Sequence, residues 1–119
     1  MKPKFDKMKT FVPAKVFDLS KRFYAEIFEA TWADTKLCGF RVGDSEFMLQ
    51  DFYQAEFANN SMYQIMVPNA QEAWRFLSEV VAKFDGTAVR PPKEEPWGTV
   101  VYLFGPSGEL WHVTQARGQ

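Results

Sequence analysis

The side chains that could take part in chemistry are few in this sequence, and they are scattered along it. His112 is the only histidine and Cys38 is the only cysteine. Because an imidazole titrates near neutral pH, His112 could act as a general base, but no second catalytic residue can be named to work with it. Cys38 has no partner for a disulfide, and we interpret it as a buried, inert thiol. The residue types therefore favour binding over catalysis, with His112 as the catalytic residue if there is one.

The composition indicates a globular protein with a small-molecule partner. The chain has 119 residues, which suits one domain, and 14 basic against 15 acidic residues, for a net charge of −1. This balance argues against a nucleic-acid or anionic-lipid partner, and no apolar run reaches the length of about 20 residues that a membrane helix needs. We find no export signal and therefore expect a cytoplasmic protein. Aromatic residues make up 17% of the chain, more than a core of this size needs, and such side chains commonly line ligand pockets.

The elements that would position these side chains occur in two similar series. The first contains a strand, then a helix whose apolar side chains recur every four residues, and then a hairpin across the turn Gly43-Asp44-Ser45. The second contains a strand, a helix capped by Asn69 that stops at Gly86, a proline-rich edge and another hairpin. The predicted ranges are 8–13, 18–30, 35–42 and 46–52 for the first series, and 62–67, 70–85, 88–97, 99–104 and 110–115 for the second. This order predicts a duplicated α+β unit.

Two segments resemble the signature segments of a known family. The first is Pro13-Ala14-Lys15 followed by SKRFYAEIFEA (20–30), and the second is EPWGTVVYLFGPSGELWHVTQ (95–115). Both are similar to segments of the glyoxalase, bleomycin-resistance and dioxygenase superfamily, the vicinal oxygen chelate proteins, and the chain is closest in character to the metal-free bleomycin-resistance-like branch. The resemblance implies a single α+β domain over residues 1–119, with two βαβββ modules at about 5–55 and about 60–117. Their strands would form a curved, cup-shaped mixed sheet with the helices on its convex side and the ligand in the cup, and the protein would form a homodimer.

The sequence departs from the family pattern at the positions that would hold a metal. Metal-dependent members bind a divalent ion with four inward-facing His, Glu or Gln side chains, one from each of four strands. The corresponding positions here fall on Lys9, Met62, His112 and either Gln50 or Leu49, depending on the strand register. Lysine and methionine are not usual ligands of such ions, which leaves Gln50 and His112 as weak candidates. We therefore expect neither a metal nor another cofactor.

If His112 faces the cup, the alternation of side chains along each strand predicts which other residues line it. Residues of one parity on each strand then point toward the ligand, while Trp111 and Val113 pack under the helices. Glu109 alternates away from His112, and we interpret it as a solvated acid. Two tryptophans at strand ends would lie at the rim, and Lys9 would point its charge into the cup. The resulting ligand-binding residues are Lys9, Trp32, Met48, Gln50, Phe52, Met62, Gln64, Trp97, Tyr102 and His112.

Three functions are compatible with these residues. A metal-free protein that sequesters an apolar or aromatic molecule is favoured by the missing metal ligands and the many aromatic side chains. A metal-dependent lyase, isomerase or dioxygenase of the same superfamily requires a different strand register. An assembly or interaction protein requires a cup that is filled by its own side chains. The sequence names neither the ligand nor whether the modules pair within one chain or across a dimer.

Overall fold

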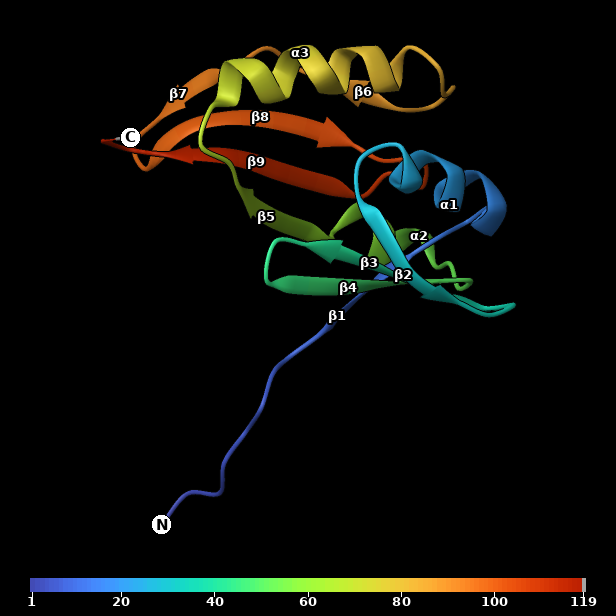
Figure 1. The fold of residues 1–119 in the computed structure, drawn as a ribbon. Helices are drawn as coiled ribbons and strands as arrows, with labels where there is room; N and C mark the ends of the chain where they lie inside the picture. The colour runs from blue at the N-terminus through green and yellow to red at the C-terminus, as the bar shows by residue number, and fades with distance from the viewer. Residues whose placement is uncertain (119) are drawn as a thin grey trace.

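The computed structural model describes residues 1–118 and shows two modules of similar connectivity (Figure 1). Module one comprises β1 (Thr10–Pro13), α1 (Phe17–Ala25), β2 (Glu29–Ala33), β3 (Leu37–Val42) and β4 (Ser45–Gln50). A short helix, α2 (Ala55–Asn59), leads to module two. Module two comprises β5 (Met62–Met66), α3 (Ala70–Val81), β6 (Ala88–Val89), β7 (Lys93–Glu95), β8 (Gly98–Phe104) and β9 (Leu110–Ala116). The N-terminal segment before β1 has no regular structure and extends away from both modules.

The two modules repeat one sheet topology. Sheet A has the strand order β1-β4-β3-β2, and sheet B has the order β5-β9-β8-β6, with β7 also paired to β8. In each sheet the first strand of the module runs parallel to the last strand, which forms an antiparallel hairpin with the strand before it. This confirms the predicted α+β class with two similar modules. Within one chain, the strands form two separate sheets rather than one continuous cup.

The helices differ in how their ends are stabilised. At α3, the Asn69 side chain accepts a hydrogen bond from the Glu72 amide at 3.0 Å, which confirms the predicted cap. Helix α1 has no side-chain cap, and it ends at Ala25 rather than at Ala30 as predicted. The prediction is wrong there because the chain from Glu29 onward pairs with β3, and Thr31 and Trp32 in that segment favour a strand. None of the helices within residues 1–118 is long and apolar enough to cross a membrane.

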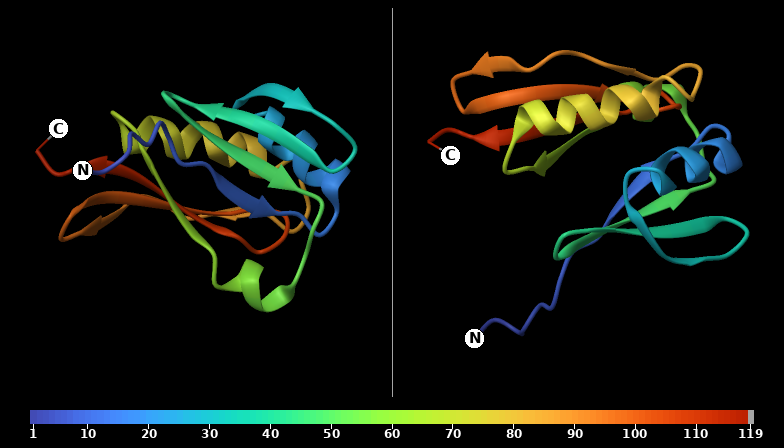
Figure 2. Two further views of the ribbon diagram at one scale, coloured as in Figure 1. Left: turned by 90° about the horizontal axis from the view of Figure 1, so that it is seen from below. Right: turned by 45° about the horizontal axis from the view of Figure 1, so that its top comes forward.

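One hydrophobic core joins the modules. Each sheet has an inner face, which packs against the helices, and an outer face on the opposite side. The inner faces contribute Phe47 from sheet A and Trp111 from sheet B, both of them buried. The ring of Tyr24, on α1, lies 5.6 Å from that of Trp111, so this helix packs against both sheets. In both views of Figure 2, α1 lies near the end of α3, where Lys83 Nζ is 2.8 Å from Glu26 Oε1.

A buried polar network reinforces this junction. Tyr24 donates a hydrogen bond to the Glu109 carboxyl, and Trp111 Nε1 donates one to the Tyr24 hydroxyl at 2.9 Å. The Ser107 amide donates to Glu109 Oε1 at 2.8 Å, and the Lys15 amide donates to the Ser107 hydroxyl at 2.8 Å. Burial raises the pKa of Glu109, and the hydrogen bonds from Tyr24 and Ser107 offset only part of that rise. The interpretation of Glu109 as a solvated acid is therefore wrong, because its side chain is fully buried between the modules.

Candidate functional site

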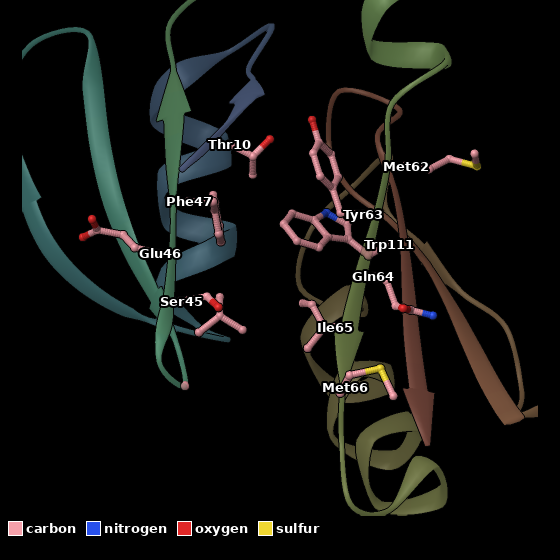
Figure 3. Close-up of a pocket in the computed structure, with 12 residues that line it drawn as sticks. Thr10, Ser45, Glu46, Phe47, Met62, Tyr63, Gln64, Ile65, Met66 and Trp111 are labelled. Atoms are coloured by element: carbon pink, nitrogen blue, oxygen red, sulfur yellow. The ribbon is translucent and has the colours of Figure 1, made fainter. Parts of the chain in front are cut away.

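The outer faces of the two sheets point away from each other. Figure 3 shows the side chain of Glu46, on β4, directed away from β5, and those of Met62 and Gln64, on β5, directed away from β4. Because side chains alternate along a strand, neighbours of the same parity share these directions. One chain therefore does not bring the ten predicted ligand-binding residues together. They divide between two walls on opposite sides of the molecule.

Sheet A supplies the first wall. Its outer face carries Met48 and Gln50 from β4 and Trp32 from the edge strand β2. Leu49 is fully buried in the core, so Gln50 is the member of this pair that faces outward. Met48 is also buried, whereas Trp32 and Phe52, which follows β4, are 43% and 44% exposed. The predicted residues of module one thus lie on one face, with the aromatic rings most accessible.

Charged side chains lie at one end of this wall. Lys9 Nζ is 2.8 Å from Glu46 Oε1, and the Thr31 hydroxyl donates a hydrogen bond of 2.6 Å to Glu46 Oε2. The hydrogen bonds with Lys9 and Thr31 lower the pKa of Glu46, which is therefore ionised at neutral pH. Arg41, on the neighbouring strand, is directed to Glu29, with 3.8 Å between Nη1 and Oε1. Lys9 does point onto the wall, as predicted from its position, but it is paired within the chain.

Sheet B supplies the second wall. Gln64, His112 and Tyr102 form a row across β5, β9 and β8. The ring of Tyr102 lies 4.9 Å from that of His112, and its hydroxyl donates a hydrogen bond of 2.6 Å to Glu95, which raises the pKa of Tyr102. His112 Nε2 is buried and has no hydrogen-bond partner among the described residues. Trp97, in the turn between β7 and β8, is 50% exposed at the end of this wall.

A cleft separates the inner faces of the two sheets at their open end (Figure 3). Its volume is about 520 Å³, and its aromatic lining includes Phe47, Tyr63 and Trp111, with the last two rings 4.7 Å apart. The polar atoms of those two rings are already paired, Trp111 Nε1 with Tyr24 and the Tyr63 hydroxyl with the Phe11 carbonyl at 3.2 Å. Trp111 lies under the helices as predicted. The cleft itself depends on how the two sheets pack, which strand alternation does not determine.

Known proteins match this chain in structure but not in sequence. No protein-family model and no curated protein matches the sequence. A bleomycin-binding protein from bleomycin-producing Streptomyces verticillus, complexed with copper(II)-bleomycin, matches the structure with a TM-score of 0.81 at 21% identity, covering 98% of this chain and 100% of that one. A second bleomycin-binding protein, complexed with bleomycin, matches with a TM-score of 0.77 at 19% identity, covering 95% of this chain and 100% of that one. This chain has the vicinal oxygen chelate fold.

The similarity extends to other proteins of that fold. A glyoxalase/bleomycin resistance protein/dioxygenase from Nocardioides matches with a TM-score of 0.75 at 15% identity, covering 100% of this chain and 89% of that one. In each case the match spans both modules, so these proteins share the duplicated topology of this chain.

The residues at the metal positions of the vicinal oxygen chelate fold do not fit a metal ion. Lys9 is a cation paired with Glu46, and Met62 offers only a thioether. Gln50 and His112, the two remaining candidates, lie within one chain on the outer faces of different sheets, which point in opposite directions. Across residues 1–118, no three His, Cys, Asp or Glu side chains come together as a possible metal site. Within one chain, the described residues at these four positions therefore do not supply the ligand set that such a metal site needs.

The sheet registers make the two outer faces of this fold directly comparable. In the core, the pair Val12 and Leu49 corresponds to the pair Ile65 and Val113. On the outer face of each sheet, cross-strand partners beside this core pair form a middle row. The partners two residues further along the strands form an end row. The middle rows are Phe11, Met48 and Gly39 in sheet A and Gln64, His112 and Tyr102 in sheet B. The end rows are Lys9, Glu46 and Arg41 in sheet A and Met62, Leu110 and Phe104 in sheet B.

Sequence reasoning missed two acidic residues on these walls. Glu46 has the same parity as Met48 and Gln50, so alternation along the predicted hairpin could have placed it on the outer face. Glu95 lies in the proline-rich edge, where no periodicity predicted β7. Only the paired strands bring it to Tyr102.

Proposed function

We propose that this protein binds a planar, largely apolar small molecule without a metal ion, in a cup that two copies of the chain form together. The exposure of the outer faces is the observation that supports this most. Met62, Met66 and Phe11 lie there with 67%, 56% and 52% of their surface exposed. Large apolar side chains gathered on an exposed face are typical of a surface that a ligand or a partner covers.

The orientation of the walls favours a homodimer. Because the outer faces of one chain point in opposite directions, they do not enclose one ligand together. In a dimer with two-fold symmetry, sheet A of one chain can face sheet B of its partner, and the reciprocal contact then forms as well. Two equal cups result, each with one wall from either module.

The polar groups on the walls suit recognition better than catalysis. Gln50 and Gln64 present amide groups from fixed positions on strands, which is typical of the few polar contacts that orient a ligand in an apolar pocket. His112 is the candidate general base, but its Nε2 is buried and therefore not placed to exchange a proton with a ligand. We thus propose a binding protein rather than a lyase, an isomerase or a dioxygenase.

Calorimetric titration with bleomycin and with copper(II)-bleomycin, together with sedimentation velocity, tests this proposal, because solved structures of this fold contain both molecules. We expect a dimer that binds at least one of them. Replacing Met62 and Met66 together by Asp should abolish the dimer and weaken binding by about tenfold or more, because each charge would be buried in the interface. The matched control, Val16→Asp, alters a side chain that is 54% exposed at the start of α1 and should change neither property.

Metal analysis of the purified protein provides the second test. Stoichiometric zinc, nickel, manganese or iron would contradict the metal-free site. A monomer that binds ligand as tightly as the Val16→Asp control would contradict the shared cup.

A further inference from the structure

The outer face of sheet A has a hollow at Gly39, and three polar atoms converge on it. A side-chain Cβ at this position would stand 2.5 Å from Thr31 Oγ1, 3.0 Å from Glu46 Oε2 and 3.1 Å from Trp32 Nε1. Tyr102 occupies the equivalent place in sheet B and fills it. The absence of a side chain at Gly39 is therefore what allows the carboxylate, the hydroxyl and the indole to meet.

The carboxylate in this hollow is fixed in position and only partly covered. Thr31 holds Glu46 Oε2 at 2.6 Å, and the Glu46 side chain retains 18% of its surface exposure. A shallow depression of about 360 Å³ opens beside it and is lined by Lys7, Arg41 and Ser45 among others. A solvent-accessible path thus reaches the carboxylate from outside the molecule.

The cation that now neutralises this carboxylate comes from a weakly held part of the chain. Lys9 precedes β1, and the segment before β1 has no regular structure and projects away from the body of the protein (Figure 1). The Lys9 side chain is 39% exposed even though its Nζ lies 2.8 Å from Glu46. Because the Lys9 end of this ion pair is exposed to solvent, the pair contributes only modest stability, and another ammonium group can replace Lys9.

We propose that Glu46, Thr31 and Trp32 form a site for the protonated amino group of a ligand, which Lys9 occupies as an internal counter-ion until the ligand displaces it. This assignment rests on the proposed binding function and names the ligand class: a planar, apolar molecule that carries a primary amine. The amine binds the Glu46 carboxylate as the Lys9 ammonium does. The Trp32 ring, 43% exposed, provides an aromatic surface next to that charge.

Of the neighbouring cations, Lys7 lines the depression, and its charge contributes less than Lys9 to the lowered pKa of Glu46. Arg41 is turned toward Glu29, at 3.8 Å, and so does not neutralise Glu46. In the equivalent end row of sheet B, Met62, Leu110 and Phe104 provide only apolar surface. A cup with one wall from each sheet therefore receives an amine at one side and an apolar body at the other.

Three probes that share an indole ring test the amine site by calorimetric titration: tryptamine, which is a cation, tryptophol, which is neutral, and indole-3-propionate, which is an anion. We expect tryptamine to bind the protein about tenfold more tightly than tryptophol, and indole-3-propionate to bind most weakly. Lys9→Met should strengthen tryptamine binding by about threefold or more, since no internal cation has to leave, and should leave tryptophol binding unchanged. Glu46→Gln should reduce tryptamine affinity to that of tryptophol.

Two further variants distinguish loss of the amine site from loss of folding. Glu79→Gln removes an exposed carboxylate on α3, outside both walls, and should leave all three affinities unchanged. Thr31→Val keeps the shape of the hollow but removes the hydroxyl that holds Glu46, and it should weaken tryptamine binding alone. Equal affinities for the three probes in the unmodified protein would overturn the amine site while leaving the proposed binding function intact. Failure of all three probes and of bleomycin to bind would overturn both.

Discussion

The outer faces of sheet A and sheet B occupy equivalent places in a duplicated fold, yet their chemistry differs. An ion pair between Lys9 and Glu46 in sheet A stands where sheet B has Met62 beside Leu110. The inner faces, by contrast, are both built from large apolar side chains that share one core. Packing therefore constrains the inner positions of both modules in the same way, whereas the outer positions are free to serve a ligand.

The largest expected effect separates inner from outer positions. Trp111→Ala removes a buried ring from the shared core and should lower the free energy of unfolding by about 3–5 kcal/mol. Met62→Ala, on the adjacent strand but the outer face, should change it by about 0.5 kcal/mol or less. Urea unfolding at protein concentrations low enough to favour the monomer measures both. Similar losses in the two variants would show that the faces are not energetically distinct.

The hollow at Gly39 gives the next largest effect. Gly39→Ala places a methyl group 2.5 Å from Thr31 Oγ1. The side chains around the methyl group must move to avoid this clash, which should lower the free energy of unfolding by about 1–3 kcal/mol. The same variant should lose tryptamine binding, because the methyl group separates Glu46 from Trp32. If thermal unfolding and tryptamine binding are both unchanged, Thr31, Glu46 and Trp32 do not converge on Gly39 in solution.

Two glutamates, one on each kind of face, should give opposite pH dependences. Burial raises the folded-state pKa of Glu109, so the folded state holds that proton more tightly than the unfolded state. The stabilising contribution of protonated Glu109 is then fully present below the unfolded-state pKa of this residue. It is lost as the pH rises through the folded-state pKa. Glu46, whose pKa the hydrogen bonds with Lys9 and Thr31 lower, stabilises the fold above its unfolded pKa and loses that contribution as the pH falls.

Urea unfolding between about pH 2 and about pH 9 tests this contrast, because the Glu46 contribution is lost below the unfolded pKa of a glutamate. Glu109→Gln replaces the protonated carboxyl by an uncharged amide, and it should remove the loss of stability that sets in as the pH rises above the unfolded pKa of a glutamate. Glu46→Gln should instead remove the loss on the acid side. A single profile shared by both variants would refute the assignment.

The smallest expected effect tests the equivalence of the end rows. Met62→Lys combined with Leu110→Glu reproduces in sheet B the ion pair of sheet A, and it should change the stability of the monomer by about 1 kcal/mol or less, because Met62 is 67% exposed there and Leu110 is partly exposed. Lysine alone at position 62 should leave an unpaired charge and bind tryptamine more weakly than the double variant. A large loss of stability in the double variant would indicate that the rows are not equivalent.

Local patterns predicted much of the fold, and side-chain alternation predicted much of each wall. The cap at Asn69 follows from spacing alone, and alternation along β9 correctly separated Trp111, which is buried, from His112, which faces outward. The burial of Glu109 was missed because its partner, Tyr24, is distant in sequence and belongs to the other module. The division of the walls was missed for the same reason: the packing of one sheet against the other depends on many contacts across the core, and no periodicity encodes it.

The parallel pairing of each module's first strand with its last also determines the order in which a growing chain can fold. β1 can pair as soon as β4 has been synthesised, but β5 has no partner in its sheet until β9 emerges from the ribosome. Long-range pairing of this kind closes a large loop and forms slowly. During that interval both edges of β5 are unpaired, whereas in the folded sheet β9 covers one of them, and an unpaired edge can pair with another chain. The exposed strand β5 is therefore open to pairing with other chains for longer than β1, until β9 has been synthesised.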